Sequence, residues 1–228
     1  MYIHFCMRIA FITPTTGYVP TSWAMHMFQI ISSTQDEKFF IVPKHYCIDS
    51  ARNQGVLTAL NQGADYIVFV DSDVIPHILI NGNLIFDPNV INHMISYRYP
   101  IISGVYITTK GHPAVYRYTG DEVKPYEPVE LKDLLGKITY ADAVGCGIVC
   151  IDRRVFEVLM DKGYFPWFEY RTKYEREETI KLWELSEDID FFDKCRRCGF
   201  RVMVYGNVFG VHIHKFRILP DGYEVDKP

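Results

Sequence analysis

The segment Tyr66–Val70 is a short apolar run rich in β-branched and aromatic residues. Such a run is typical of a central strand that is buried on both faces of a parallel sheet. Asp71, Ser72 and Asp73 follow it directly, at the end where open α/β sheets bind ligands. If the chain stays extended here, Asp71 and Asp73 point to the same side and can offer oxygen ligands to one divalent cation. The competing interpretation is that one of these three residues only caps the next turn or helix.

Two strand–helix units precede this run. The residue pattern predicts strands at residues 8–12, 38–42 and 66–70, and helices at residues 21–32 and 49–63. Alternating strands and helices indicate a parallel sheet with right-handed crossovers. The first half of the sequence therefore predicts an α/β fold, with the two acids at the end of the third strand.

The second half is expected to extend this sheet. We predict helices that begin near Asp87, Asp152 and Ser186. Residues 110–137 are expected to form a hairpin or an irregular excursion, and residues 170–181 a loop or an exposed helix. Strands are predicted at residues 101–108, 138–151 (broken at 145–147), 200–205 and 208–213.

The composition fits one sizeable domain. The chain has 228 residues, of which 48% are hydrophobic, so it can bury a proper core. We expect an extension at residues 1–6, a domain at 7–217 with halves 7–73 (nucleotide-binding) and 74–217 (acceptor-binding), and a tail at 218–228. No apolar run approaches the roughly 20 residues that cross a bilayer, and the opening segment is too short for a signal peptide. We therefore expect a soluble, cytoplasmic protein without a transmembrane segment.

Charge and cysteine content exclude two further classes of protein. A net charge of -4 with scattered Lys and Arg argues against a nucleic-acid partner. Six dispersed cysteines do not make the disulfide framework of a small secreted protein. Cys195 and Cys198 have the spacing of half a zinc site, and a local disulfide between them is left open.

Short motifs along the chain occur in the order seen in a known family. They are Ala51-Arg52-Asn53, Asp71-Ser72-Asp73, Gly145-Cys146-Gly147, Pro166-Trp167-Phe168, Ser186-Glu187-Asp188 and Val211-His212-Ile213. Over roughly residues 7–215 the chain resembles metal-dependent GT-A glycosyltransferases of the inverting family 2 type. The resemblance implies a single Rossmann-like α/β domain with a mixed, mainly parallel sheet flanked by helices. It also implies hexosyltransferase-type transfer from a nucleoside-diphosphate sugar to a hydroxyl acceptor.

The resemblance assigns a metal site. It makes Asp73 a direct ligand of Mn²⁺ or Mg²⁺, with Asp71 as a ribose contact or a further ligand. A late histidine completes the site, and His212 and His214 are both candidates, with the Val-His-Ile context favouring His212. A divalent cation would neutralise the charge that develops on the leaving diphosphate. The alternative for each histidine is a satisfied side chain beside the sheet.

The resemblance also names a base. The second acid of the Glu187-Asp188 pair would take the proton of the acceptor hydroxyl, which assigns that role to Asp188. The positive end of a helix dipole favours an ionised carboxylate at this position. Ordinary capping by Ser186 with first-turn acids explains the same residues, and Asp190 is a weaker rival base.

The nucleotide of the sugar donor is expected to contact residues that follow the first and second strands. Thr13, Pro14 and Thr15 would line the nucleotide base, together with Ser72. Arg52 could reach the base or the diphosphate, or it could be a surface or core arginine.

Two further residue groups have interpretations that the sequence leaves open. Gly145 and Gly147 would leave room where donor and acceptor meet, or form a structural bulge. Trp167 and Phe168 would form a sugar platform, or lie in the core.

Other functions remain open on sequence alone. A non-catalytic nucleotide- or sugar-binding module could keep this fold without turnover. A nucleotidyltransferase normally carries a Gly-rich loop with a basic residue after the first strand, and residues 13–17 have no basic residue. A haloacid-dehalogenase-type phosphohydrolase usually places its Asp-x-Asp after the first strand, whereas two strands precede it here. The donor (a UDP- or GDP-sugar), the acceptor and the oligomeric state, with a homodimer as one option, are not identified.

Overall fold

A central sheet organises the molecule. The computed structural model describes residues 7–15, 17–34, 36–43, 47–122, 124–176, 180–213, 216–219 and 222–225. Within these residues nine strands form the sheet. Their order is β2 (Glu37–Ile41), β1 (Arg8–Ile12), β3 (Tyr66–Val70), β11 (Ile148–Asp152), β6 (Ile101–Tyr106), β14 (Val202–His212), β4 (Val74–Ile80) and β5 (Asn83–Ile85), and β9 (Ile138–Ala141) pairs with β14.

Strand directions make this sheet mixed and mainly parallel. Strands β2, β1, β3, β6, β14 and β5 run one way, while β11, β4 and β9 run the other way. The parallel part β2-β1-β3 is the portion that the alternating strands and helices predicted. The predicted fold class, a single α/β domain with a mixed, mainly parallel sheet flanked by helices, is confirmed.

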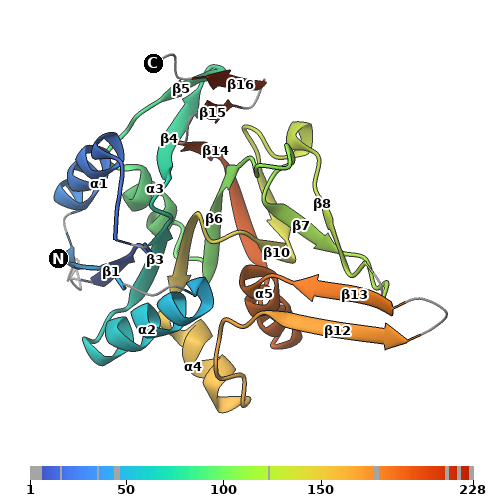
Figure 1. Cartoon of the computed structure of the whole chain (residues 1–228). Coiled ribbons are helices and arrows are strands. Elements are labelled where there is room, and N and C mark those ends of the chain that lie inside the picture. The colour runs from blue at the N-terminus through green and yellow to red at the C-terminus, as the bar shows by residue number, and fades with distance from the viewer. Residues whose placement is uncertain are drawn as a thin grey trace.

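Helices cover both faces of the sheet (Figure 1). They are α1 (Thr21–Ser33), α2 (Ile48–Asn61), α3 (Val90–Ser96), α4 (Arg153–Asp161) and α5 (Glu187–Arg197), with a 3₁₀ turn η1 (Leu131–Asp133). Buried side chains of α1 and α3 share one core cluster, and those of α2, α4 and α5 share the other. In β3, Ile67 and Phe69 enter one cluster while Val68 enters the other, so this strand is buried on both faces as predicted.

Among the described residues, three smaller sheets accompany the central one. Strands β7 (Val115–Tyr118), β8 (Tyr126–Pro128) and β10 (Ala143–Val144) form a three-stranded sheet. The other two are the hairpins β12–β13 (Arg171–Arg176, Ile180–Leu185) and β15–β16 (Phe216–Leu219, Gly222–Val225). The prediction of a loop or exposed helix at residues 170–181 is therefore wrong. The charged composition of this segment gave no strand signal, because these strands are defined by pairing with each other.

Two further differences concern the edge of the sheet. The hairpin β4–β5 follows directly after Asp73, where no strand was expected. Residues 202–212 form one strand instead of two, with a register shift against β6 between Val204 and Phe209. Such a bulge lets a strand continue through an irregular stretch without ending.

The caps of two helices agree with prediction. Asp152 accepts a hydrogen bond from the backbone N–H of Arg154 at 2.8 Å, and Ser186 accepts one from Ile189 at 3.4 Å. In the part of the chain that the structure describes, every helix is too short or too polar to cross a membrane.

Candidate active site

The Asp71-Ser72-Asp73 segment is a turn that joins β3 to β4. The backbone N–H of Val74 donates to the carbonyl oxygen of Asp71 at 3.1 Å. The indole N–H of Trp23 in α1 donates to the carbonyl oxygens of Asp71 (2.9 Å) and Val74 (3.0 Å), which fixes the turn from the side. The expectation of an extended segment is therefore wrong, because the chain reverses here to form the antiparallel strand β4. Ser72 lies half-buried in this turn.

Arg52 is the centre of the site. This residue of α2 is only 2% exposed, and its guanidinium contacts carboxylates from two distant parts of the chain. The distances are 3.2 Å from Nη1 to Asp71 Oδ1, 3.4 Å from Nε to Glu187 Oε1 and 3.2 Å from Nε to Asp188 Oδ1. Three of the predicted motifs therefore meet around one buried cation. Arg52 acts on these acids directly, which the sequence did not indicate.

Arg52 stays protonated in this position. Burial by itself lowers the pKa of a guanidinium, but the surrounding acids, Asp188 first and then Asp71, raise the pKa of Arg52 well above its ordinary value. The guanidinium also lies over the ring of Phe69, with 5.5 Å between its central carbon and the ring centroid. A permanently charged arginine thus compensates part of the negative charge of the cluster.

Asp188 lies in the first turn of α5 and is held on both carboxylate oxygens. Its Oδ2 accepts a hydrogen bond from the backbone N–H of Cys146 at 3.1 Å, and its Oδ1 contacts Arg52. Burial raises the pKa of Asp188 to about 7; Arg52 opposes this increase, and the charges of Glu187 and Asp71 add to it. The expected helix-dipole effect is thus outweighed by burial. A carboxyl with a pKa near neutrality can both accept and release a proton under ordinary conditions.

Glu187 and Asp190 have structural partners. Glu187 contacts Arg52 and is hydrogen-bonded to the hydroxyl of Tyr170. Asp190 is fully buried and forms ion pairs with Lys194 (2.6 Å) and Arg171 (2.5 Å). Asp190 therefore faces away from the Arg52 cluster, as its position two residues after Asp188 predicted. Of the acids at the start of α5, Asp188 has the geometry best suited to a base.

Asp73 and His212 come from neighbouring backbone segments. His212 ends β14 and pairs with Val74 of β4, and the backbone N–H of Ile213 donates to the carbonyl oxygen of Asp73 at 2.7 Å. His212 is 8% exposed. His214, the other candidate, lies outside the described residues. The fold thus places the backbone of residue 73 beside that of residues 212 and 213, and a shared metal site of Asp73 and His212 stays a prediction.

The predicted metal ligands form only part of a site for a cation such as Mg²⁺ or Mn²⁺. No group of three or more His, Cys, Asp or Glu side chains in the described part of the chain is arranged to hold a metal ion. Asp71 is engaged by Arg52, which leaves Asp73 and His212 as the sequence-predicted ligands in the described part of the chain. Mg²⁺ and Mn²⁺ commonly keep several waters and bind through substrate phosphates, so two protein ligands are compatible with such a site.

Thr13, Pro14 and Thr15 connect the first strand to α1. The hydroxyl of Thr13 donates to the carbonyl oxygen of Val70 at 2.9 Å, and its backbone N–H donates to Ile41 at 3.0 Å. The hydroxyl of Thr15 donates to Tyr18 at 3.0 Å. Both threonine hydroxyls are used to hold the loop at the carboxyl ends of β1, β2 and β3. These residues shape the predicted nucleotide edge of the sheet.

Tyr106, at the end of β6, was not predicted as a site residue. A Cβ atom placed on Gly145 would lie 1.9 Å from its hydroxyl oxygen, and one on Gly147 would lie 2.8 Å from its ring. The two glycines therefore leave room for this tyrosine, while the backbone of Gly147 accepts a hydrogen bond from Asp71 at 3.2 Å. The ring centroid of Tyr106 is 5.3 Å from that of His212. Only its place at the end of a predicted strand could have indicated it.

The environment of Tyr106 ties it to the rest of the site. Burial raises its pKa well above the ordinary value, and the charges of Asp188 and Asp71 raise it further. Tyr106 therefore stays protonated, and its hydroxyl can donate a hydrogen bond within the cluster.

Trp167 and Phe168 lie in the core, so the platform interpretation is wrong. Both are fully buried, and the ring of Phe168 stacks on Phe191 with 4.5 Å between centroids. The side chain of Asn53 donates to Phe168 and accepts from the backbone N–H groups of both aromatic residues. The motif instead connects helix α2 to the segment after α4.

Cys195 and Cys198 are both free thiols. The local disulfide is therefore absent, and these residues belong to no metal-binding group among the described residues.

Comparisons with known proteins bear on the fold. No family model matches the sequence, and no curated protein matches it. The solved structure of A197 from STIV superposes with a TM-score of 0.61 at 17% identity, covering 97% of this chain and 95% of that chain.

Two further structures are similar at lower scores. A candidate nucleotide-diphospho-sugar transferase from Desulfovibrio desulfuricans G20 has a TM-score of 0.42 at 10% identity, covering 87% of this chain and 78% of its own. UDP-glucose pyrophosphorylase in its apo form has a TM-score of 0.42 at 10% identity, covering 90% and 74%. At such identities a likeness concerns the fold alone. The chain shares its α/β fold with A197 from STIV over nearly the full length of both proteins.

Proposed function

We propose that this protein is a metal-dependent glycosyltransferase that moves a sugar from a UDP- or GDP-sugar to a hydroxyl acceptor with inversion. The main support is the position of Asp188. A buried carboxyl with a pKa of about 7 shares one cluster with Asp71 through Arg52, at the sheet edge that also carries Asp73 and His212. Perturbed carboxyls of this kind are concentrated at catalytic sites.

The roles follow from the contacts. Asp73 and His212 would hold Mn²⁺ or Mg²⁺, which would supply positive charge to the diphosphate. Arg52 holds Asp71 and Asp188 in a fixed arrangement and keeps part of their charge compensated. The loop of Thr13, Pro14 and Thr15, with Ser72, would line the nucleotide. Tyr106 would position substrate groups that lie between Asp188 and His212.

In the reaction, ionised Asp188 takes the proton of the acceptor hydroxyl. The oxygen forms a bond to the anomeric carbon, and the bond from that carbon to the diphosphate oxygen breaks. The electron pair leaves with the nucleoside diphosphate. Attack on the face opposite the leaving group gives inversion, and removal of the proton by a positioned base is worth about 10²–10⁴-fold.

Nucleotide binding tests the proposal. Thermal shifts with UDP or GDP, with Mn²⁺ or with a chelator, should show stabilisation only when metal is present. A ligand at 100 times its dissociation constant adds about 2.7 kcal/mol to stability. Asp73→Asn should remove most of this shift, whereas Asp161→Asn, at the exposed end of α4, should leave it intact.

Other outcomes point to the alternatives. Equal nucleotide binding with and without chelator would favour a binding module. Release of pyrophosphate instead of a nucleoside diphosphate would favour a nucleotidyltransferase. Full transfer activity in Asp73→Asn would refute the metal role.

A further inference from the structure

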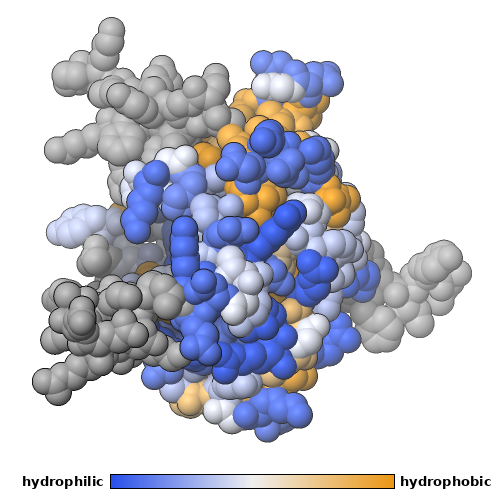
Figure 2. Space-filling model, turned by 90° about the vertical axis from the view of Figure 1, so that its right-hand side faces the viewer, coloured by the Kyte–Doolittle hydropathy of each residue, from blue (hydrophilic) through white to orange (hydrophobic). Residues whose placement is uncertain are grey.

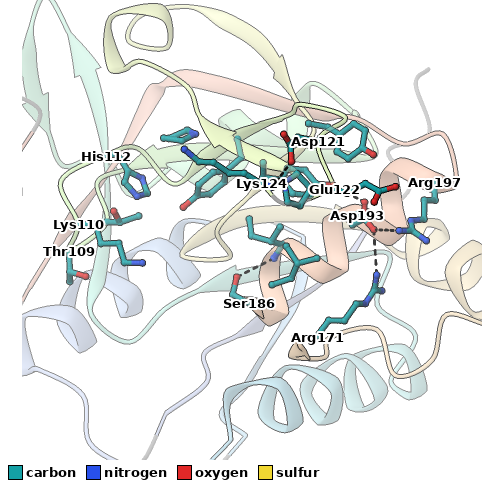
Figure 3. Close-up of a pocket in the computed structure, with 18 residues that line it drawn as sticks. Thr109, Lys110, His112, Asp121, Glu122, Lys124, Arg171, Ser186, Asp193 and Arg197 are labelled. Carbon is teal, nitrogen blue, oxygen red and sulfur yellow. Dashed lines mark hydrogen bonds and ion pairs between the residues drawn. The ribbon is translucent and has the colours of Figure 1, made fainter. Parts of the chain in front are cut away.

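A pocket of about 750 Å³ lies beside the N-terminal end of α5 (Figure 3). Strands β7 and β8 supply Tyr116, Tyr118 and Tyr126 to its lining, and α5 with its cap supplies Ser186 and Ile189. Its volume falls within the roughly 300–1,000 Å³ of pockets that take drug-sized ligands. None of these tyrosines has a role in the functions described so far.

The pocket is adjacent to Asp188. Ser186 and Ile189, which line it, flank Asp188 in the first turn of α5. Tyr116 pairs with Ala143 of β10, which leads into the segment whose Cys146 N–H donates to Asp188. Burial raises the pKa of Tyr116, and the charge of Asp188 raises it further. Asp188 is not itself a lining residue, but it lies between two of them in the chain and acts electrostatically on the lining residue Tyr116, so the pocket borders the turn that carries the proposed base.

The aromatic wall is held in place before any ligand arrives. The guanidinium carbon of Arg196 lies 3.7 Å from the ring centroid of Tyr118, and Tyr118 meets Tyr126 edge-to-face at 5.6 Å. The hydroxyl of Tyr126 donates to Asp193 at 2.9 Å. Fixed rings lose little freedom on binding, which favours recognition of a flat apolar surface.

The charges of the lining are nearly balanced. Its basic residues are Lys110, Lys124, Arg171 and Arg197, and its acidic residues are Asp121, Glu122 and Asp193. Arg197 contacts Asp193 at 2.8 Å and Arg171 pairs with the buried Asp190 at 2.5 Å, so each of these two cations has a carboxylate partner. Figure 2 shows a largely hydrophilic surface on the side of the molecule that carries β7 and β8. This balance does not favour a polyanion.

We propose that this pocket binds the acceptor, and that the acceptor is a neutral oligosaccharide. This inference rests on the proposed function. A pyranose ring has an apolar C–H face that can pack on Tyr118. Its hydroxyl groups can form hydrogen bonds with the basic and the acidic side chains on the rim of the pocket. One hydroxyl then points to Asp188 and loses its proton there as the glycosidic bond forms and the nucleoside diphosphate leaves.

Two matched tyrosines provide the test. Tyr118 and Tyr140 are 41% and 42% exposed, and each carries an arginine over its ring, Arg196 at 3.7 Å and Arg201 at 5.5 Å. Tyr118 lines the pocket, and Tyr140 is absent from its lining. We would measure binding of neutral trisaccharides of glucose, galactose, mannose and N-acetylglucosamine to both alanine variants. Tyr118→Ala should weaken binding roughly tenfold, the scale of one aromatic contact, and Tyr140→Ala should not.

Transfer kinetics extend the test. In Tyr118→Ala the KM for the acceptor should increase by a similar factor, while metal-dependent hydrolysis of the donor stays unchanged. Because the acceptor is neutral, its KM should hardly change at high salt, whereas that of a charged acceptor would increase.

The inference fails if no trisaccharide binds, if both alanine variants bind equally, or if sugar is transferred to Ser/Thr peptides instead. Each of these results leaves metal-dependent nucleotide binding intact, so it does not refute the proposed function. A failure to bind nucleotide would refute the proposed function. The trisaccharide measurement would still show whether this pocket binds a neutral oligosaccharide.

Discussion

Asp188 has two opposing influences on its charge. Its place at the start of α5 favours the ionised form, while its burial favours the protonated form. Burial dominates, because the pKa is raised to about 7 in spite of Arg52. A residue's position in a helix is readable from sequence, but its desolvation depends on which segments cover it.

The first prediction concerns the pH dependence of transfer. Asp188 acts as a base only when ionised, so kcat should increase with pH and level off above about 7. Asp188→Asn should lower kcat by about 10²–10⁴-fold at every pH. A pH–rate profile of both proteins measures this. An unchanged profile in the variant would remove Asp188 from the mechanism.

The same carboxyl affects folding stability. Its pKa in the folded state is above the ordinary value of 3.8, so the folded protein binds more protons than the unfolded chain between about pH 4 and 7. The free energy of unfolding should therefore fall as pH rises through this interval. Denaturant titrations should show a smaller fall in Asp188→Asn, and an equal fall would contradict the assignment.

Arg52 gives a third prediction at this scale. Arg52→Met leaves Asp71, Glu187 and Asp188 without their buried cation, so it should lower the free energy of unfolding by roughly 3–5 kcal/mol. The control is Arg8→Met, whose ion pair with Glu37 is solvent-exposed and worth under about 1 kcal/mol. Urea denaturation compares the two variants. Similar losses would show that the cluster does not depend on Arg52.

Between elements, Tyr106 of β6 fills the space beside the turn at residues 145–147. Its hydroxyl occupies the space beside Gly145, so strand β6 and the turn at residues 145–147 fit only if that position lacks a side chain. The sequence left open whether these glycines make room for substrates or form a structural bulge, and it could not indicate which residue needed the room.

Gly145→Ala tests this contact. The added methyl would overlap the hydroxyl of Tyr106 and should cost about 1–3 kcal/mol of stability. Adding Tyr106→Phe should recover part of that loss, because the overlapping oxygen is gone. In the control, Gly120→Ala, nothing lies within 4 Å and only the positive φ of +80° resists the change. Tyr106→Phe should not rescue it. Thermal unfolding of the single and double variants decides the point, and equal rescue would contradict the contact.

At the scale of the whole molecule, β11 connects the two predicted halves. It comes from residues 148–152, yet it lies between β3 of the first half and β6 of the second. Both core clusters also contain residues from both halves. The boundary at residue 73 therefore does not separate two independent packing units.

Cooperative unfolding is the consequence. We expect one calorimetric transition with equal calorimetric and van't Hoff enthalpies, because the halves share one sheet. A fragment of residues 1–73 should not fold alone, since β3 would lose its partner β11 and expose Val68 and Phe69. Two separate transitions, or a folded fragment by circular dichroism, would contradict this.

The sequence by itself determined the local elements and their class. The alternating strands and helices predicted β2-β1-β3, and capping residues predicted the starts of α4 and α5, because these depend on residues close in the chain. It also indicated Asp71, Asp73, Asp188 and His212 as candidates. The hairpins β4–β5 and β12–β13 escaped prediction, since their strands are stabilised by pairing and not by local propensity.

Only the tertiary structure decided what those residues contact. The ion pairs of Arg52 join positions up to 136 residues apart, the space at Gly145 belongs to Tyr106, and Trp167 lies in the core. The pKa of Asp188 follows from desolvation by several segments at once. Burial and charge proximity are properties of the assembled fold, and no local pattern in the chain encodes them.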